Sequence, residues 1–276
     1  MPSNREAYFE ALKLDIPKSV IEFALQEVNG FSNLELTKNF DEEIKDYSFF
    51  KNAIKRYIDG EMIEYIFNKA YFLSIPFFVN KDVLIPRQET EQLVLKTIEI
   101  IKEMFSDKTI NIADVCTGSG CIGISIAKAL PGNRYFLTDI SKEALRVAKN
   151  NTNLCPEVDI KCLQGDMLDP LKDIKLDVIV CNPPYISDVN DIDEKTWKQE
   201  PHLALLAEPS TFYYEKVLKE CSSIMNPRSL LAFEIGEDME SSLNQLVRKY
   251  CPNATYFFEK DMYGKTRFLF IKQLGI

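Results

Sequence analysis

The 276-residue sequence has only one histidine, His202, and only one tryptophan, Trp197. A single histidine leaves a Ser-His-Asp triad with one candidate base and excludes a multi-histidine metal site. None of the seven cysteines forms a C-x-x-C pair, so neither a disulfide framework nor a zinc knuckle is indicated. We therefore expect reduced thiols and no metal.

Long apolar runs and an excess of basic residues are also missing. No run reaches the 18 or so apolar residues that a membrane span needs, and the first residues lack the basic-then-apolar order of a signal peptide. We therefore expect a cytoplasmic protein without membrane association. The net charge of −9 opposes broad binding to phosphate backbones, so no stable nucleic-acid binding is expected.

The residues that are present predict two unequal domains. In residues 1–70, Ser3 and Glu6 form a capping-box pattern, and apolar residues at helical spacing predict two helices before Gly30. A third helical stripe runs from Ile44 to Ile58 and stops at Gly60. This part of the chain is expected to be a small helical domain.

Strand and helix patterns alternate in the rest of the chain. Residues 71–90 are rich in aromatic and branched residues, interrupted at 80–82, and predict a hairpin linker. In residues 91–276, apolar strand-like runs alternate with amphipathic stretches, which is typical of a doubly wound, mostly parallel α/β sheet. The last run, 267–272, follows another strand after a short loop and is expected to be antiparallel.

A glycine-rich loop follows the first of these strands. Cys116-Thr117-Gly118-Ser119-Gly120-Cys121-Ile122-Gly123 contains G-x-G-x-x-G at a strand-to-helix turn, where free N–H groups attract anionic ligands. Asp139, 19 residues beyond Gly120, is placed to bind two ribose hydroxyls. Asp114 could orient the loop or bind the amino end of a cofactor. The pattern suits either a nicotinamide cofactor or S-adenosylmethionine, and a tightly packed glycine turn is the alternative.

The tetrapeptide Asn182-Pro183-Pro184-Tyr185 follows the fourth strand, at the edge where open α/β sheets place their ligands. The Asn182 side-chain oxygen and the Pro183 carbonyl can accept the two hydrogens of a planar –NH2 group, and the Tyr185 ring can cover its face. This arrangement favours methyl transfer to an amide nitrogen, for which alignment matters more than a strong base. The alternative is a simple end to the strand.

With these residues the chain resembles the release-factor glutamine methyltransferases, the HemK-type protein-(glutamine-N5) methyltransferases. Besides NPPY, the resemblance rests on six segments: VLIPRQETE (83–91), DVCTGSGCIGISIA (114–127), TDIS (138–141), QEPHLAL (199–205), FEIG (233–236) and YGKTRF (263–268). Two departures stand out. Cys116 replaces the usual first glycine of the loop, and residues 206–211 replace a glycine-rich acidic segment.

The resemblance implies a helical domain at 1–70 that recognises the protein substrate and a seven-stranded, Rossmann-like catalytic domain. It implies S-adenosylmethionine as cofactor and S-adenosylhomocysteine as product. Cys116, Thr117, Gly118, Ser119, Gly120, Asp139, Met167 and Asn182 would lie against the cofactor, with Met167 near the adenine. Asn182, Pro183, Pro184 and Tyr185 would hold the substrate glutamine and form the catalytic group.

The implied substrate is the Gly-Gly-Gln loop of peptide chain release factors, methylated by a monomeric enzyme. Two alternatives keep the cofactor and mechanism: glutamine methylation of a ribosomal protein, and adenine-N6 methylation of nucleic acid. A nicotinamide-dependent dehydrogenase would use the glycine loop and Asp139 but would leave NPPY unexplained. A cofactor-binding scaffold without catalytic activity is the remaining alternative.

Overall fold

The computed structural model describes residues 1–106 and 108–274, and the chain divides into two compact units at Lys69 and Ala70. The first unit contains α1 (Asn4–Leu12), α2 (Lys18–Asn29), α3 (Asn33–Lys38), α4 (Tyr47–Ile58) and α5 (Ile63–Phe67). Its apolar side chains pack into a core of their own, which includes Ile21, Leu25 and Phe50. The short helices α3 and α5 were not expected from the sequence.

Side-chain caps mark the start of α1, α3 and α4 in the first unit. The predicted capping box is confirmed, because Ser3 Oγ accepts from the Glu6 N–H at 3.2 Å and the Glu6 carboxylate accepts from the Ser3 N–H at 2.8 Å. The third predicted helix begins later than its apolar stripe. Asp46 caps it by accepting a hydrogen bond from the Phe49 N–H at 2.8 Å, so Ile44 lies before the helix.

The hairpin lies earlier in the chain than predicted. Its strands are β1 (Lys69–Phe72) and β2 (Ile75–Phe78), and its turn is at Leu73 and Ser74, where φ is 49° and 62°. The expectation that the hairpin turn lies at 80–82 was wrong, because β2 ends at Phe78, before the local turn there. The hairpin is anchored by Phe72 and Phe77, which are fully buried in the core of the second unit and pack edge to face.

The second unit is built on a seven-stranded sheet with the order β5-β4-β3-β6-β7-β9-β8. Its strands are β3 (Asn111–Val115), β4 (Arg134–Asp139), β5 (Asp159–Gln164), β6 (Leu176–Cys181), β7 (Met225–Glu234), β8 (Thr255–Lys260) and β9 (Thr266–Leu274). Its helices are α6 (Gln88–Met104), α7 (Cys121–Ala129), α8 (Lys142–Asn151), α9 (Glu194–Gln199), α10 (Phe212–Ile224) and α11 (Glu240–Tyr250).

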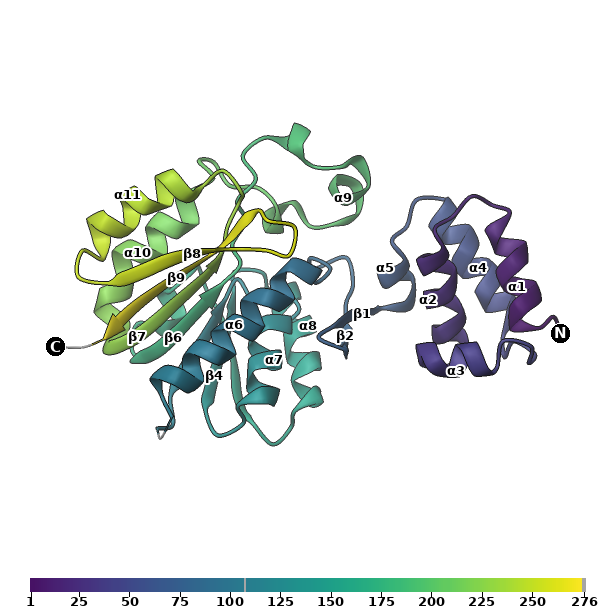
Figure 1. Cartoon of the computed structure of the whole chain (residues 1–276), viewed down its shortest axis with the longest axis horizontal. Helices are drawn as coiled ribbons and strands as arrows, with labels where there is room; N and C mark the ends of the chain where they lie inside the picture. Colours follow the sequence, from purple (N-terminus) through teal and green to yellow (C-terminus); the bar gives the residue numbers. More distant parts are fainter. Residues whose placement is uncertain (107, 275–276) are drawn as a thin grey trace. The chain divides into compact units, whose positions relative to one another are not determined.

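Both faces of the sheet are covered, and alternate residues of its strands serve the two faces. Val178 and Val180 of β6 pack in one core with α6, α7 and α8, whereas Ile179 and Cys181 pack in the other with α10 and α11. Figure 1 shows these two groups of helices on opposite sides of the sheet. Burial on both faces explains why β6 is continuously apolar from Val178 to Cys181.

The doubly wound α/β fold is therefore confirmed. Strands β3 to β7 pair in parallel, and β9 is antiparallel to both β7 and β8, as the short loop before it predicted. Because β9 returns between β7 and β8, the final hairpin extends the sheet without a crossover helix.

Candidate active site

Parallel pairing brings the predicted loops together at one edge of the sheet. Val115, the last residue of β3, pairs with Cys181 of β6 and with Thr138 of β4. The next residues along these strands begin the glycine loop, the Asn-Pro-Pro-Tyr segment and Asp139. Strands β4 and β5 lie on one side of β3, and β6 and β7 lie on the other. This change of direction is the point where open α/β sheets bind ligands.

The glycine loop turns through left-handed backbone. The φ angle is 60° at Cys116, 53° at Gly118 and 82° at Gly120. The Gly120 N–H donates to the Thr117 carbonyl at 2.8 Å, and the Thr117 N–H donates to the Thr138 carbonyl at 2.9 Å. A Cβ atom added to Gly118 would meet no other atom within 4 Å. The backbone at Gly118 is therefore open to a ligand.

The loop also holds Asp139 in place. The Asp139 carboxylate accepts hydrogen bonds from the Gly118 N–H and the Ser141 N–H, both at 2.9 Å. Burial raises the pKa of Asp139, and these backbone donors act against that rise. The position of the carboxylate thus depends on the conformation of the glycine loop.

Asp114 lies beneath the loop and is 1% exposed. Its Oδ2 atom accepts from the Gly123 N–H at 2.8 Å and from the Thr117 hydroxyl, while Oδ1 has no partner among the described residues. Burial raises the pKa of Asp114 to about 7, although both hydrogen bonds lower it. A Cβ at Gly123 would lie 2.9 Å from the Asp114 Cβ, so only glycine fits there. These contacts favour the loop-orienting role for Asp114.

Two buried side chains, Thr90 and Glu234, are linked to Asn182 by hydrogen bonds. Asn182 Nδ2 donates to Thr90 Oγ1 at 3.4 Å, and the Thr90 hydroxyl donates to Glu234 Oε2 at 2.6 Å. Burial raises the pKa of Glu234 to about 7, and the Thr90 hydroxyl and the nearby Asn182 amide act in the opposite direction. Tyr185 is half-buried and lies close to Gly236, where an added Cβ would be 3.5 Å from its ring. The tetrapeptide is thus supported by α6 and β7.

The glycine loop and Asn182 open onto one cavity of about 220 Å³. The predicted site residues that line it are Cys116, Thr117, Gly118, Ser119, Asp139, Met167, Asn182 and Pro184. Gly120, Pro183 and Tyr185 adjoin these residues in the chain but are not among those that line the cavity. Gly120 instead precedes α7, and a Cβ there would come within 2.8 Å of the Ile124 side chain. Packing against α7 thus requires glycine at this position, and its contact with a cofactor stays a prediction.

Sequence reasoning missed Thr90 and Glu234 as site residues. Thr90 lines the cavity, and both side chains are buried, with 2% and 3% exposure. They lie 144 positions apart, so no local pattern connects them. The available signal was their position inside two of the segments that carry the family resemblance, 83–91 and 233–236.

The segment 199–205 holds the end of the linker beside the cavity. The buried Glu200 side chain pairs with Arg87 and accepts a hydrogen bond from the Ile85 N–H at 3.2 Å. Burial raises the pKa of Glu200, and Arg87 acts against that rise. Arg87 in turn lines the cavity. This contact explains why two distant segments of the resemblance occur together.

His202 organises the same segment. Its Nε2 lies 2.8 Å from the Trp197 carbonyl oxygen, and the two rings stack with centroids 3.4 Å apart. Neither His202 nor Trp197 is among the residues that line the cavity. The single histidine is thus engaged in local structure.

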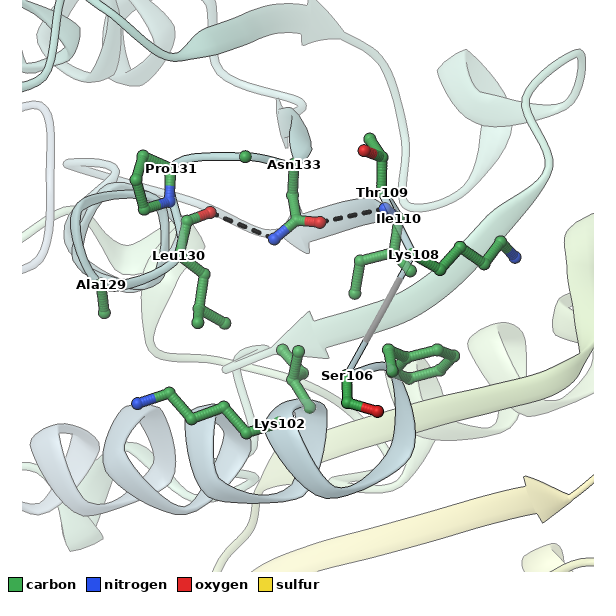
Figure 2. Close-up of a pocket in the computed structure, with 12 residues that line it drawn as sticks. Lys102, Ser106, Lys108, Thr109, Ile110, Ala129, Leu130, Pro131 and Asn133 are labelled. Carbon is green, nitrogen blue, oxygen red and sulfur yellow. Dashed lines mark hydrogen bonds between the residues drawn. The ribbon is translucent and has the colours of Figure 1, made fainter.

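A second hollow, of about 570 Å³, lies near the amino ends of β3 and β4. Figure 2 shows Asn133 between two backbone groups there: it donates to the Leu130 carbonyl at 3.1 Å and accepts from the Ile110 N–H at 3.0 Å. Because ligands of open α/β sheets bind at the carboxyl ends of the strands, this hollow is not the active-site candidate.

Within residues 1–106 and 108–274, no group of three or more His, Cys, Asp or Glu side chains comes together in a way that could hold a metal ion. None of the helices described has both the length and the apolar character needed to cross a bilayer.

Comparisons with known proteins show which family the chain is similar to. The family model for the methyltransferase small domain matches residues 92–199. The release factor glutamine methyltransferase of Mycoplasma mycoides subsp. mycoides SC is 39% identical over 217 residues, which cover 76% of each chain. That of Bacillus subtilis is 32% identical over 258 residues, which cover 91% of this chain and 89% of that protein.

Solved structures share the fold at much lower identity. The hMettl16 catalytic domain has a TM-score of 0.59 and 13% identity, and the match covers 97% of this chain and 91% of that one. A methyltransferase from Pyrococcus furiosus has a TM-score of 0.55 and 16% identity, with 82% and 100% covered. At these identities the likeness concerns the fold alone.

Proposed function

The chain belongs to the release factor glutamine methyltransferase family, and from this premise we propose the reaction that its cavity performs. The methyl group of S-adenosylmethionine is transferred to the side-chain amide nitrogen (N5) of the glutamine in the Gly-Gly-Gln loop of peptide chain release factors. The observation that carries this proposal is that one cavity is lined by both Asp139 and Asn182. The loop expected to bind the cofactor and the tetrapeptide expected to hold the substrate amide thus face the same cavity.

The residues around the glycine loop fit S-adenosylmethionine. Asp139 offers a carboxylate to the ribose hydroxyls, as suits a ribose without a 2′-phosphate. Gly118 leaves its backbone uncovered beside that carboxylate, and Met167 lines the cavity where an adenine ring would need an apolar neighbour. S-adenosylhomocysteine, which keeps the same adenosine, would bind to the same groups.

S-adenosylmethionine, held by Asp139, Gly118 and Met167, would supply an electrophilic methyl carbon and a neutral sulfur leaving group. Asn182 Oδ1 and the Pro183 carbonyl accept the two hydrogens of the substrate amide and orient its nitrogen. These acceptors stabilise the positive charge that develops on nitrogen, so they bind the transition state more strongly than the ground state. The nitrogen then loses one proton to water, and no strong base is required.

The direct test uses the purified protein, labelled S-adenosylmethionine and three separate pools: release factors, ribosomal proteins and nucleic acid. The proposal expects label on a release factor and, by mass spectrometry, one added methyl on the glutamine of the Gly-Gly-Gln peptide. Label on ribosomal protein or on adenine instead would overturn the proposed substrate. Label in no pool, together with binding of a nicotinamide cofactor, would overturn the reaction.

We also propose that the helical unit recognises the protein substrate. This unit packs around its own core, whereas the lining of the cavity comes from the second unit. A chain that begins at Asn68 keeps Phe72 and Phe77, which belong to the core of the catalytic unit. It should bind cofactor like the full chain and lose most of its activity toward intact release factor. If the shortened chain keeps full activity toward release factor, the helical unit does not recognise the substrate.

A further inference from the structure

We propose that Thr90 and Glu234 are positioning residues that fix the side-chain amide of Asn182 with its oxygen toward the substrate. This inference rests on the proposed function, because it assigns the orientation of the group that is to hold the substrate glutamine. Thr90 lies in the first turn of α6, Glu234 ends β7 and Asn182 follows β6. Three elements therefore meet at one hydrogen-bonded chain.

The direction of the chain follows from the chemistry of the three groups. An ionised carboxylate only accepts hydrogen bonds, so the single Thr90 proton goes to Glu234, at 2.6 Å between the oxygens. Thr90 Oγ1 then has only lone pairs left, and it accepts from Asn182 Nδ2 at 3.4 Å. With its nitrogen held on the inner side, Asn182 has Oδ1 free as an acceptor for a substrate N–H.

A neutral Glu234 would remove this direction. Its own proton could go to Thr90 Oγ1, whose hydroxyl would then be free to donate to Asn182 Oδ1. The Asn182 side-chain amide would then flip. Its –NH2 group, which only donates, would face the substrate –NH2 group, which is also a donor. The ionised carboxylate is therefore the productive form.

Other charged and titratable groups surround Glu234. They are Glu89 of α6, Cys121 of α7, Tyr185, Tyr214 of α10 and Arg267 of β9. Burial raises the pKa of Cys121 to about 12 and raises the pKa values of both tyrosines, so these three stay neutral near pH 7. Arg267 favours the ionised form of Glu234 and Glu89 disfavours it.

The first test compares threonine variants of α6. Thr90→Val keeps the shape of the side chain but removes the hydroxyl, and it should lower kcat about 10- to 100-fold through misalignment. Thr90→Ser restores the hydroxyl and should recover most of the rate. The matched control is Thr97→Val, since Thr97 is fully buried in the same helix and its hydroxyl has no partner among the described residues.

A comparison of kcat with cofactor affinity distinguishes misalignment of Asn182 from misfolding of the variant. Cofactor affinity should be the same in Thr90→Val and Thr97→Val, and both variants should be folded at the assay temperature. The thermal midpoint of Thr90→Val should be lower, because this variant loses a hydrogen bond to the buried Glu234. If Thr90→Val and Thr97→Val have the same kcat as the parent, the proposal is overturned. A parent protein that fails to methylate any release factor would instead count against the proposed function.

The second test is the pH dependence of kcat. The ionised form is productive, so kcat of the parent should fall as the pH decreases through about 7, the pKa of Glu234. Glu234→Gln should have a low kcat without this inflection. A kcat of Glu234→Gln equal to that of the parent at pH 8 would overturn the role of the carboxylate.

A third readout does not depend on turnover. In ¹⁵N spectra of the full chain, the side-chain amide signal that disappears in Asn182→Ala identifies Asn182. Its Nδ2 protons should exchange slowly with solvent in the parent and at least tenfold faster in Thr90→Val. Equal exchange in the two proteins would contradict the hydrogen bond on which the inference stands.

Discussion

The two walls of the cavity are built in different ways. The cofactor-side wall, residues 116–120 with Asp139, is held by backbone N–H groups and left-handed turns within a short stretch of chain. The amide-side wall, Asn182–Tyr185 with Thr90 and Glu234, is held by side chains from three separate elements. One wall is a local backbone structure, and the other exists only once the sheet and α6 have packed.

This difference assigns different tasks to the two walls. Backbone donors cannot rotate away, so the cofactor-side wall suits tight binding of a constant ligand. The amide-side wall orients one side chain through a hydroxyl and a buried carboxylate, which suits alignment of a reacting group. Changes on one side should therefore alter affinity, and changes on the other should alter rate.

The largest effect is expected on the amide-side wall, from Asn182→Ala. Loss of one oriented partner of the transition state should cost about 2.7 to 4 kcal/mol, or roughly 10² to 10³ in rate. Asn182→Asp keeps an acceptor but loses the donor to Thr90, so it should retain more activity than the alanine variant. Single-turnover assays measure both variants. Equal rates for the parent and Asn182→Ala would show that Asn182–Tyr185 only ends the strand and has no role in catalysis.

The next prediction concerns the free energy of unfolding. The ionised Glu234 carboxylate is expected to support catalysis but to destabilise the fold. The pKa of Glu234 is raised from 4.5 to about 7, so the folded state holds a proton that the unfolded chain releases above pH 4.5. This contribution to stability is present at pH 4.5 and is lost as the pH rises through 7. At pH 8, Glu234→Gln should thus be more stable than the parent by about 3 kcal/mol.

Denaturant unfolding at two pH values checks this sign. The gain of Glu234→Gln over the parent should be large at pH 8 and fall below about 1 kcal/mol at pH 5, where the folded parent carboxyl is neutral. A variant that is less stable than the parent at pH 8 would indicate that the ionised carboxylate stabilises the fold.

A smaller effect is expected on the cofactor-side wall. Asp139→Ala removes the carboxylate that we propose binds the ribose, so cofactor affinity should fall by about 1 to 3 kcal/mol. The rate at saturating cofactor should change little. Calorimetry measures the affinity, with Asp188→Ala on an exposed loop as the control. An unchanged affinity for Asp139→Ala would exclude this carboxylate from the cofactor site.

The smallest effect concerns Cys116, a residue with a φ angle of 60° at a left-handed position. Cys116→Gly relieves the backbone but loses the side-chain contact with Met167, 3.5 Å between the sulfur atoms. The net change in stability should stay within about 1 kcal/mol. Cys116→Val, whose branched side chain disfavours this φ, should be clearly less stable. The reverse order in thermal unfolding would contradict the strain argument.

The two walls also differ in how far the sequence predicts them. The glycine loop and Asp139 follow one another at a recognisable spacing, and NPPY follows an apolar run, so each could be found locally. The bond between Thr90 and Glu234 joins residues 144 positions apart. It depends on the packing of α6 against β7, and no periodicity predicts which polar side chains meet there.

The errors in the fold have similar causes. Asn80 and Asp82 form a local turn, with the Asp82 N–H donating to Asn80 Oδ1 at 3.0 Å, and this turn suggested the wrong hairpin position. The true turn uses Leu73 and Ser74, because tertiary burial of the phenylalanines on either side overrides local preference. Helices α3 and α5, with 6 and 5 residues, are too short for a helical period to appear.

The central claim is that the cofactor-side wall binds and the amide-side wall aligns. It is tested most directly by measuring, in Asp139→Ala and Asn182→Ala together, the affinity for S-adenosylmethionine and the single-turnover rate of methyl transfer to a release factor at saturating cofactor. The account predicts a weak affinity with a near-parental rate for Asp139→Ala, and a near-parental affinity with a rate reduced about 10²- to 10³-fold for Asn182→Ala. If both variants lose affinity and rate in the same proportion, the two walls do not have separate tasks and the account is contradicted.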